Sequence, residues 1–131
     1  MIDLDNFKRV NDTLGHQFGD TVLIETANLI RSKLSSGDII ARYGGEEIIV
    51  YINEANDENE VFKRVENIRK AVEFNAIKRE SVTKHVTASF GVSFYPNDGS
   101  NISEIIKSAD KLLYKAKYSG KNKVVSSHFY R

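Results

Sequence analysis

The sequence predicts an α/β domain of the α+β kind, in which helices flank a central, mainly antiparallel sheet. Four segments carry apolar residues at the spacing of a helix face, and short strand-like runs separate them. Mid-chain, two of those runs are joined by a glycine pair, which is typical of a β-hairpin and forces an antiparallel strand pair. The expected order over residues 1–131 is β-α-α-β-β-α-β-α-β, which a doubly wound parallel sheet fits less well.

The first third of the chain is expected to hold one strand and two helices. Residues 1–4 form a short strand candidate, and residues 7–14 follow as a short helix that ends at Gly15. Asp20 then stands where the N-cap of a second amphipathic helix would lie. Residues 35–37, Ser-Ser-Gly, break that helix before the hairpin begins.

The second half carries the clearest periodic patterns. Asp57, with a glutamate three residues later, has the form of a capping box before a third helix. Residues 85–95 alternate strictly between apolar and polar, which predicts a long half-buried strand. The apolar stripe of residues 102–116 predicts the last helix, with Gly120 as its C-cap and a closing strand over residues 123–125.

Composition excludes several classes of function. A net charge of +1 argues against nucleic-acid binding through bulk electrostatics, and the lack of cysteine excludes disulfides and thiolate–metal sites. No apolar run approaches the ~20 residues of a membrane span, and the first residues lack the pattern of a signal peptide. We expect a cytoplasmic protein, or the cytoplasmic part of a larger and even membrane-bound one. This segment itself should contact neither nucleic acid nor membrane.

Residues 42–47, Arg-Tyr-Gly-Gly-Glu-Glu, place two adjacent carboxylates directly after the expected turn. Across a two-residue turn, Tyr43 would face Glu46 and Arg42 would face Glu47. Arg42 would then neutralise Glu47 and leave Glu46 on the opposite face without a basic partner. Glu46 is therefore either a solvated residue of the hairpin tip or a ligand for a hard cation such as Mg²⁺.

A second acidic pair, Asp3 and Asp5, lies where the first strand passes into a helix. If that strand and the hairpin belong to one sheet, Asp3 and Glu46 converge at its edge. Aspartates before a helix are often caps, but together with Glu46 they favour a metal site. Helix N-terminal amides beside that site would be free to bind phosphates. These amides belong to Asn6, Phe7 and Lys8.

Taken in order, these segments resemble the GGDEF domains of bacterial diguanylate cyclases. The matching segments are residues 3–8, Asn11-Asp12, Gly15-His16, Gly19-Asp20, residues 42–47, residues 89–92, Ala109-Asp110 and residues 114–122. The resemblance covers essentially the whole chain, and several motifs in the right order are far more specific than a lone Gly-Gly-Glu-Glu. It implies a ferredoxin-like, nucleotidyl-cyclase palm fold.

The resemblance also implies a reaction: two GTP molecules condense into cyclic di-GMP and two pyrophosphates. The 3′-hydroxyl of each GTP attacks the α-phosphate of the other, with metal assistance. Asp3 and Glu46 are the implied ligands of Mg²⁺ or Mn²⁺, assisted by the Leu4 carbonyl. Glu46 is also the candidate for helping to deprotonate the hydroxyl, and Glu47 is a further catalytic candidate. Because each site would hold one GTP, the resemblance implies a transient homodimer, with a sensor domain upstream.

Five further residues match substrate positions of the family. Asn11 and Asp20 match the positions that recognise guanine, and Leu23 matches an apolar wall beside the base; the alternative is that Asn11 and Asp20 cap helices. Lys117 and Lys121 match the positions that hold the β- and γ-phosphates, whereas on composition alone they would complement a helix dipole. Lys121 stands where the family often has arginine, so it lacks the bidentate fork.

Three departures from the family pattern have consequences. Ile48 replaces the usual phenylalanine after the motif, an apolar change from which we expect little effect. Ser35 occupies the arginine position of the family's Arg-x-x-Asp inhibitory site, whose aspartate is Asp38, so tight product inhibition should be lost. The chain also lacks the helix and segment that precede the first strand in the family, and we expect it to be a piece of a longer protein.

Two classes of function remain open from the sequence. The first is a diguanylate cyclase, and the second is a catalytically weak or inactive domain that binds GTP or a protein partner and regulates a neighbour. Retention of Asp3, Glu46 and Glu47 favours the enzyme. A cyclic di-GMP receptor is less consistent with Ser35, and related palm folds that make other products share the two-carboxylate layout.

Overall fold

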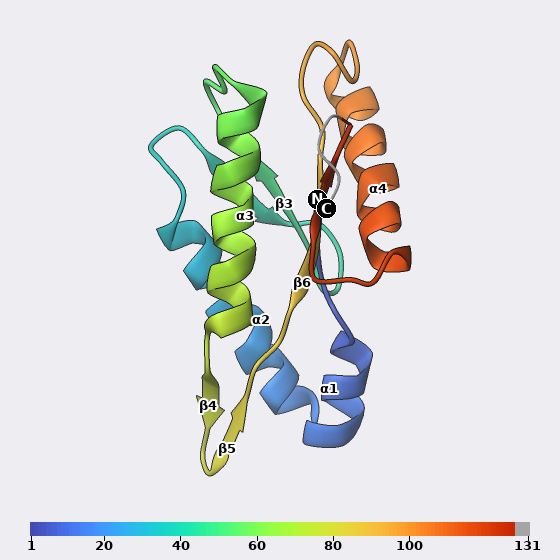
Figure 1. Cartoon of the computed structure of the whole chain (residues 1–131). Helices are drawn as coiled ribbons and strands as arrows, with labels where there is room; N and C mark the ends of the chain where they lie inside the picture. The colour runs from blue at the N-terminus through green and yellow to red at the C-terminus, as the bar shows by residue number, and fades with distance from the viewer. Residues whose placement is uncertain (128–131) are drawn as a thin grey trace.

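A computed structural model describes residues 1–127 of the chain and contains two sheets and four helices within that range (Figure 1). The elements are β1 (Ile2–Leu4), α1 (Phe7–Leu14), α2 (His16–Ser32), β2 (Ile39–Arg42), β3 (Glu47–Tyr51), α3 (Glu58–Phe74), β4 (Ile77–Arg79), β5 (Val82–Lys84), β6 (Ala88–Val92), α4 (Ile102–Tyr118) and β7 (Val124–Ser126).

The main sheet has five strands in the order β2-β3-β1-β6-β7. All neighbouring pairs are antiparallel except β6 and β7, which run parallel. The mainly antiparallel sheet and the palm fold expected from the sequence are therefore confirmed. The first strand lies at the centre of the sheet, between the hairpin strand β3 and the alternating strand β6.

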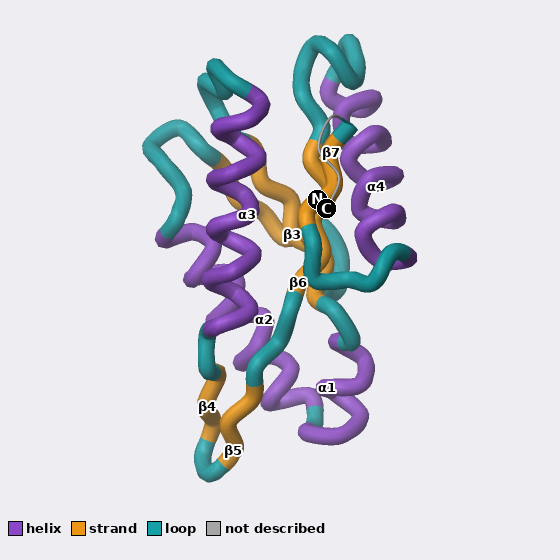
Figure 2. The backbone as a smooth tube through the Cα atoms, in the orientation of Figure 1, coloured by secondary structure: helices purple, strands orange, loops and turns teal. Residues whose placement is uncertain are grey.

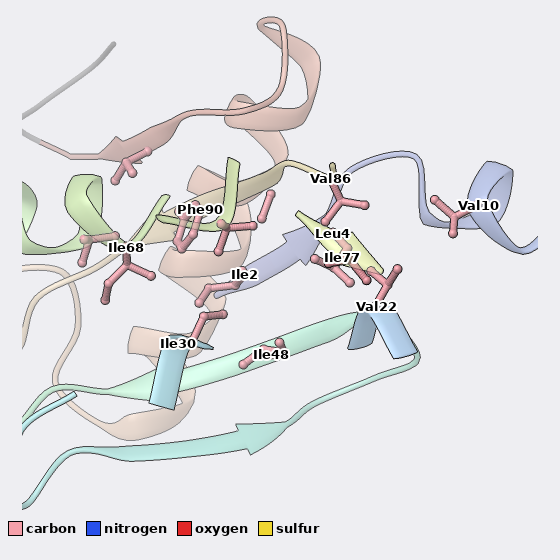
Figure 3. Close-up of a cluster of buried hydrophobic side chains, with 14 of the residues drawn as sticks. Ile2, Leu4, Val10, Val22, Ile30, Ile48, Ile68, Ile77, Val86 and Phe90 are labelled. Carbon is pink, nitrogen blue, oxygen red and sulfur yellow. The ribbon is translucent and has the colours of Figure 1, made fainter. Parts of the chain in front are cut away.

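Helices cover both faces of this sheet, with α2 and α3 on one side of the strands and α4 on the other (Figure 1). Ile2 and Leu4 point into the larger core with residues of α2 and α3, and Figure 3 shows them beside Ile30, Ile48 and Phe90. Burying each such side chain contributes roughly 1.5–3 kcal/mol to the free energy of unfolding. Side chains alternate along β1, so Asp3 faces the side of the sheet that α4 covers.

The helix ends agree with the sequence in part. Asp57 caps α3 by accepting a hydrogen bond from the Asn59 amide (2.9 Å). Gly15 ends α1, and Gly120 takes a φ of 118° directly after α4, one residue beyond the C-cap. The expectation for Asp20 is wrong, because α2 begins at His16 and Asp20 lies inside it. The φ of 90° at Gly15 lets one helix follow the other without a linker.

The long half-buried strand expected over residues 85–95 is wrong in its length and in its burial, because residues 88–91 are buried on both faces of the sheet. Only β6 joins the main sheet, while residues 82–84 pair with residues 77–79 in a separate hairpin that extends away from the sheet (Figure 2). Alternation indicates which side chains share a face but not which strands pair with each other. No helix in residues 1–127 is long and apolar enough to cross a membrane.

Close packing of α4 on β6 yields a test of the fold. A Cβ atom at Gly91 would lie 2.2 Å from the Ala109 carbonyl oxygen and 2.3 Å from the Leu113 nitrogen, both in the α4 backbone. We expect Gly91→Ala to lower the free energy of unfolding by about 1–3 kcal/mol, because the helix must shift away from the sheet. Urea denaturation measures the change. Gly45→Ala is the matched control, since no atom lies within 4 Å of its added Cβ; equal stability of the two variants would contradict the prediction.

Candidate active site

The pairing of β1 with β3 brings the predicted carboxylates together at one end of the strands, where β1 ends and β3 begins. Asp3 pairs in register with Glu47, and the Leu4 amide donates to the Glu46 carbonyl (3.3 Å). Asp3 and Glu46 therefore lie at adjacent strand ends, as the shared-sheet hypothesis required. We call Asp3, Glu46 and Glu47 the acidic edge.

The hairpin itself differs from the prediction. Its register places Tyr43, not Arg42, opposite Glu47, and the amides of Tyr43 and Gly44 both donate to the Glu47 carbonyl. Neither Gly44 nor Gly45 has a positive φ, so the turn is not a primed two-residue turn. One extra loop residue shifts the cross-strand pairs by one position, which moves each side chain to a different partner.

The expected pairing of Arg42 with Glu47 is wrong for the same reason. The Arg42 guanidinium instead donates to the carbonyl oxygens of Gly44 (3.1 Å) and Gly45 (2.8 Å), which stabilises the hairpin tip. Among the described residues, Arg42 forms no ion pair with a carboxylate. Both glutamates of the motif thus add negative charge to the edge without compensation from their own hairpin.

This accumulation of negative charge affects the pKa of Asp3. Its partial burial raises the pKa of the carboxyl group, Lys117 lowers it, and the nearby Glu46 and Glu47 carboxylates raise it again. The net result is a pKa above the usual value for aspartate. A group with like-charged neighbours and a raised pKa binds a cation favourably, because the cation relieves the repulsion.

Lys117 reaches this edge from the last turn of α4. Its Nζ donates to the carbonyl oxygens of Asp3 (3.3 Å) and Leu4 (3.2 Å) and to Asp5 Oδ1 (2.7 Å), and it lies 3.4 Å from Asp3 Oδ1. The structure therefore places this lysine against the groups implied as metal ligands, rather than out beside the helix end. Lys121 lies apart from them and donates to Asn6 Oδ1 (3.0 Å).

Asp5 is the most buried carboxylate of the site, with only 4% of the residue exposed. Besides Lys117, it accepts hydrogen bonds from Thr87 Oγ1 (2.7 Å), Ser89 Oγ (2.7 Å) and the Asn122 amide (3.0 Å). Burial alone would raise its pKa, but these donors outweigh burial and hold the pKa below its usual value. Asp5 is thus fully engaged within the protein and acts as a positioning residue.

A second set of contacts holds the turn after α4 that presents these groups. Asn122, with a φ of 49°, accepts from Arg69 (2.7 Å) and donates to Glu73 (2.8 Å), both on α3. Arg69 also forms ion pairs with Glu66 and Glu73. The sequence indicates no separate role for Ser89 or Asn122, although both lie in segments that match the family, residues 89–92 and 114–122. Ser89 also lies on the polar face of the predicted strand.

The first turn of α1 lies next to the acidic edge. Asn6, the N-cap residue, has a left-handed φ of 56° and gives no side-chain hydrogen bond to the helix. The Asn6 side chain therefore leaves the backbone amides at the start of α1 uncapped, and these include the amides of Asn6, Phe7 and Lys8. An anion site at a helix N-terminus requires such uncapped amides.

The candidates for guanine recognition lie where α1 crosses α2. A Cβ at Gly19 would come within 1.8 Å of Asn11 Oδ1, so the two helices touch at this point. Asp20 follows Gly19 with an exposed side chain, and Leu23 lies one turn further and is partly buried against the core. Neither Asn11 nor Asp20 caps a helix, since Asn6, Gly15 and Lys33 hold those positions. The capping alternative is therefore wrong.

Asp38, the aspartate of the inhibitory-site position, already has hydrogen-bond and ion-pair partners within the protein. Its carboxylate accepts from the amides of Ser35 (2.8 Å) and Asn53 (2.9 Å) and pairs with Arg64 of α3 (2.5 Å). Arg64 also donates to Ser35 Oγ (3.0 Å). Burial raises the pKa of Asp38, but these donors outweigh it and the net shift is downward.

An apolar cleft lies away from this chemistry. It encloses about 510 Å³ and is lined mainly by apolar residues at the other end of β1, between β3 and β6. Met1, Val50 and Val92 are among its lining residues, and no member of the acidic edge is. The candidate active site therefore lies at the ends of β1 and β3 and outside this cleft.

Comparison with known proteins agrees with this arrangement. The family model described as diguanylate cyclase, GGDEF domain, matches residues 1–123, and the chain belongs to this family. The chain is 44% identical over 127 residues to diguanylate cyclase A of Treponema denticola. That match covers 97% of this chain but 34% of the relative, so the chain spans about a third of the relative's length.

Solved structures show the same fold. The GGDEF domain of YfiN from Pseudomonas aeruginosa is 29% identical with a TM-score of 0.93, over 98% of this chain and 80% of that one. The active GGEEF domain of a diguanylate cyclase from Vibrio cholerae is 35% identical with a TM-score of 0.84, over 98% and 81% of the two chains.

The buried carboxylate of Asp5 generates a prediction about pH. Its lowered pKa means that the ionised form stabilises the fold above the unfolded-state pKa of about 3.9, and that this contribution is lost as the pH falls through the lower folded-state value. We expect Asp5→Asn to lower the free energy of unfolding by about 3 kcal/mol at pH 7, because it leaves Lys117 without its closest partner.

The difference between Asp5→Asn and wild type should shrink below pH 4, as the wild-type carboxylate becomes protonated. Urea denaturation at pH 7 and pH 3 measures both values. The exposed Asp12→Asn variant is the control and should stay within about 0.5 kcal/mol of wild type. A loss of stability of the same size at both pH values would contradict the assignment.

Proposed function

We propose that this chain is the catalytic domain of a diguanylate cyclase, which condenses two GTP molecules into cyclic di-GMP and two pyrophosphates. The observation that carries the proposal is the meeting of Asp3, the Leu4 carbonyl and Glu46 beside the first turn of α1. Family membership and the names of the relatives support the same activity.

The oxygen donors at the acidic edge suit a hard divalent cation. Two carboxylates and one carbonyl match the preference of Mg²⁺ or Mn²⁺, which also take phosphate oxygens and water. Within residues 1–127 no three acidic or imidazole side chains are close enough together to hold a metal ion by themselves, so part of the ligand set would come from the nucleotide. Bound there through Asp3, Leu4 and Glu46, the cation would acidify the 3′-hydroxyl and stabilise charge on the leaving pyrophosphate.

The chain's own residues take the other parts in this proposal. Glu46 accepts the proton of the 3′-hydroxyl, and Glu47 adds to the field that favours its loss. The amides of Asn6, Phe7 and Lys8, together with Lys117 and Lys121, hold the phosphates. Asn11 and Asp20 form hydrogen bonds with the guanine edge, while Leu23 packs beside the base.

The proposal extends to the assembly. One site holds one GTP, and the reaction joins two, so two copies of the domain must face each other transiently. A sensor domain upstream would control that encounter, and GTP as substrate places the domain in the cytoplasm. The same site without turnover would be a GTP-binding regulatory module, and the experiment below distinguishes the two.

Substitution of Glu46 tests the chemistry. We expect the protein with GTP and Mg²⁺ to form cyclic di-GMP, identified by mass, and Glu46→Gln to lower the rate at least about 100-fold through loss of the general base. Glu60→Gln, on the exposed surface of α3, is the matched control. Absence of cyclic di-GMP from wild type would reject the cyclase in favour of the regulatory module. Formation of cyclic di-GMP at equal rates by Glu46→Gln and wild type would reject Glu46 as the general base.

The inhibitory-site position yields a separate prediction. Because Ser35 supplies no guanidinium and Asp38 is held by Arg64, we expect no tight binding of cyclic di-GMP there. Isothermal titration of the protein with cyclic di-GMP measures this, and Ser35→Arg should tighten binding at least tenfold by adding the missing fork. Tight binding by wild type that Asp38→Ala abolishes, in a variant that remains folded, would contradict it.

A further inference from the structure

Lys117 lies where a metal ion would need to bind. Its ammonium donates to the Leu4 carbonyl (3.2 Å) and lies 3.4 Å from Asp3 Oδ1, two of the oxygens assigned to the cation. Mg²⁺ holds its ligands at about 2.1 Å, so an ion on these oxygens would be a close neighbour of the ammonium. Two cations this close repel strongly, because the site is only partly exposed to solvent.

Lys117 is the cation that neutralises Asp3 and Asp5. Among residues 1–127, the ion pairs of Asp3 and Asp5 are formed with Lys117 alone, and Lys121 is engaged with Asn6 instead. Glu46 and Glu47, at the start of β3, add further negative charge beside Asp3. In the absence of metal, Lys117 therefore supplies the positive charge that the acidic edge needs.

The contacts also allow Lys117 to leave. Asp5 keeps its hydrogen bonds from Thr87, Ser89 and the Asn122 amide when the ammonium moves away, so this buried carboxylate is not left without donors. Lysine has a flexible four-carbon stem, unlike the rigid fork of arginine. A triphosphate at the first turn of α1 offers the ammonium a more highly charged partner nearby.

We propose that Lys117 is an internal counter-cation that competes with free divalent metal for the oxygens of Asp3 and Leu4, so that metal binds tightly only together with a triphosphate. The inference rests on the metal site of the proposed function. It makes the binding of metal and nucleotide mutually favourable, since each removes the obstacle to the other. The domain would then remain without metal until a nucleotide arrives.

Binding of Mn²⁺ alone to the protein, followed by electron paramagnetic resonance, tests the proposal. Without nucleotide, Lys117→Met should bind Mn²⁺ at least tenfold more tightly than wild type, because the competing charge is gone. Lys115→Met, on the exposed surface of the same helix, is the matched control and should bind as wild type does. Lys117→Arg keeps the charge and should also bind Mn²⁺ weakly.

Nucleotide affinity should change in the opposite direction from Mn²⁺ affinity. With 3′-deoxy-GTP, which lacks the attacking hydroxyl, Lys117→Met should bind the nucleotide at least tenfold more weakly and lose its advantage for Mn²⁺. A merely structural role would weaken both ligands together. Lys117→Gln serves as a second uncharged variant if Lys117→Met does not fold, since its amide can still donate to Asp5.

Adding Asp3→Asn to Lys117→Met separates this inference from the proposed function. If the added substitution abolishes Mn²⁺ binding while Lys117→Met and Lys117→Gln bind no more tightly than wild type, the metal site stands and the counter-cation is refuted. If Asp3→Asn leaves Mn²⁺ affinity unchanged, the metal is not held at Asp3 and the proposed site itself fails.

Discussion

The buried carboxylate of Asp5 is the interaction on which the site depends. A charged group removed from water is very costly unless donors surround it, so Asp5 depends on Thr87, Ser89 and the Asn122 amide, and Lys117 adds a fourth donor in this structure. These donors come from the segment before β6, from β6 itself, from α4 and from the turn after α4. One carboxylate thereby ties the end of β1 to four parts of the chain that are distant from it in the sequence.

This constraint also explains the electrostatics of the neighbouring edge. Asp3 lies two residues from Asp5 and on the same face of the sheet, where burial and the motif glutamates disfavour its ionised form. Lys117 serves both aspartates, tightly for Asp5 and more loosely for Asp3. A lysine shared between a structural carboxylate and a ligand carboxylate couples the stability of the fold to the charge state of the site.

Much of the fold could be predicted because it follows from local periodicity. The helix-face spacing of α3 and α4 reflects single faces that each bury against the core, whereas β6 is buried on both faces and its alternation shows only which side chains share a face. The pairing of strands could not be predicted in the same way. The register of the β2–β3 hairpin depends on one extra loop residue, and the β4–β5 hairpin depends on the pairing of two three-residue strands. Neither feature leaves a periodic signal in the sequence.

The sequence by itself determined the family, the mainly antiparallel palm and the candidates Asp3 and Glu46, because motif residues and their order are local properties of the chain. Only the tertiary structure decided which charged groups pair with each other. In it, Arg42 binds the hairpin carbonyls rather than Glu47, Asp38 pairs with Arg64, and Lys117 pairs with Asp3 and Asp5. Ion pairs form across more than 100 residues of sequence here, as with Lys117 and Asp5, and distances of that kind exist only once the sheet and its helices have packed.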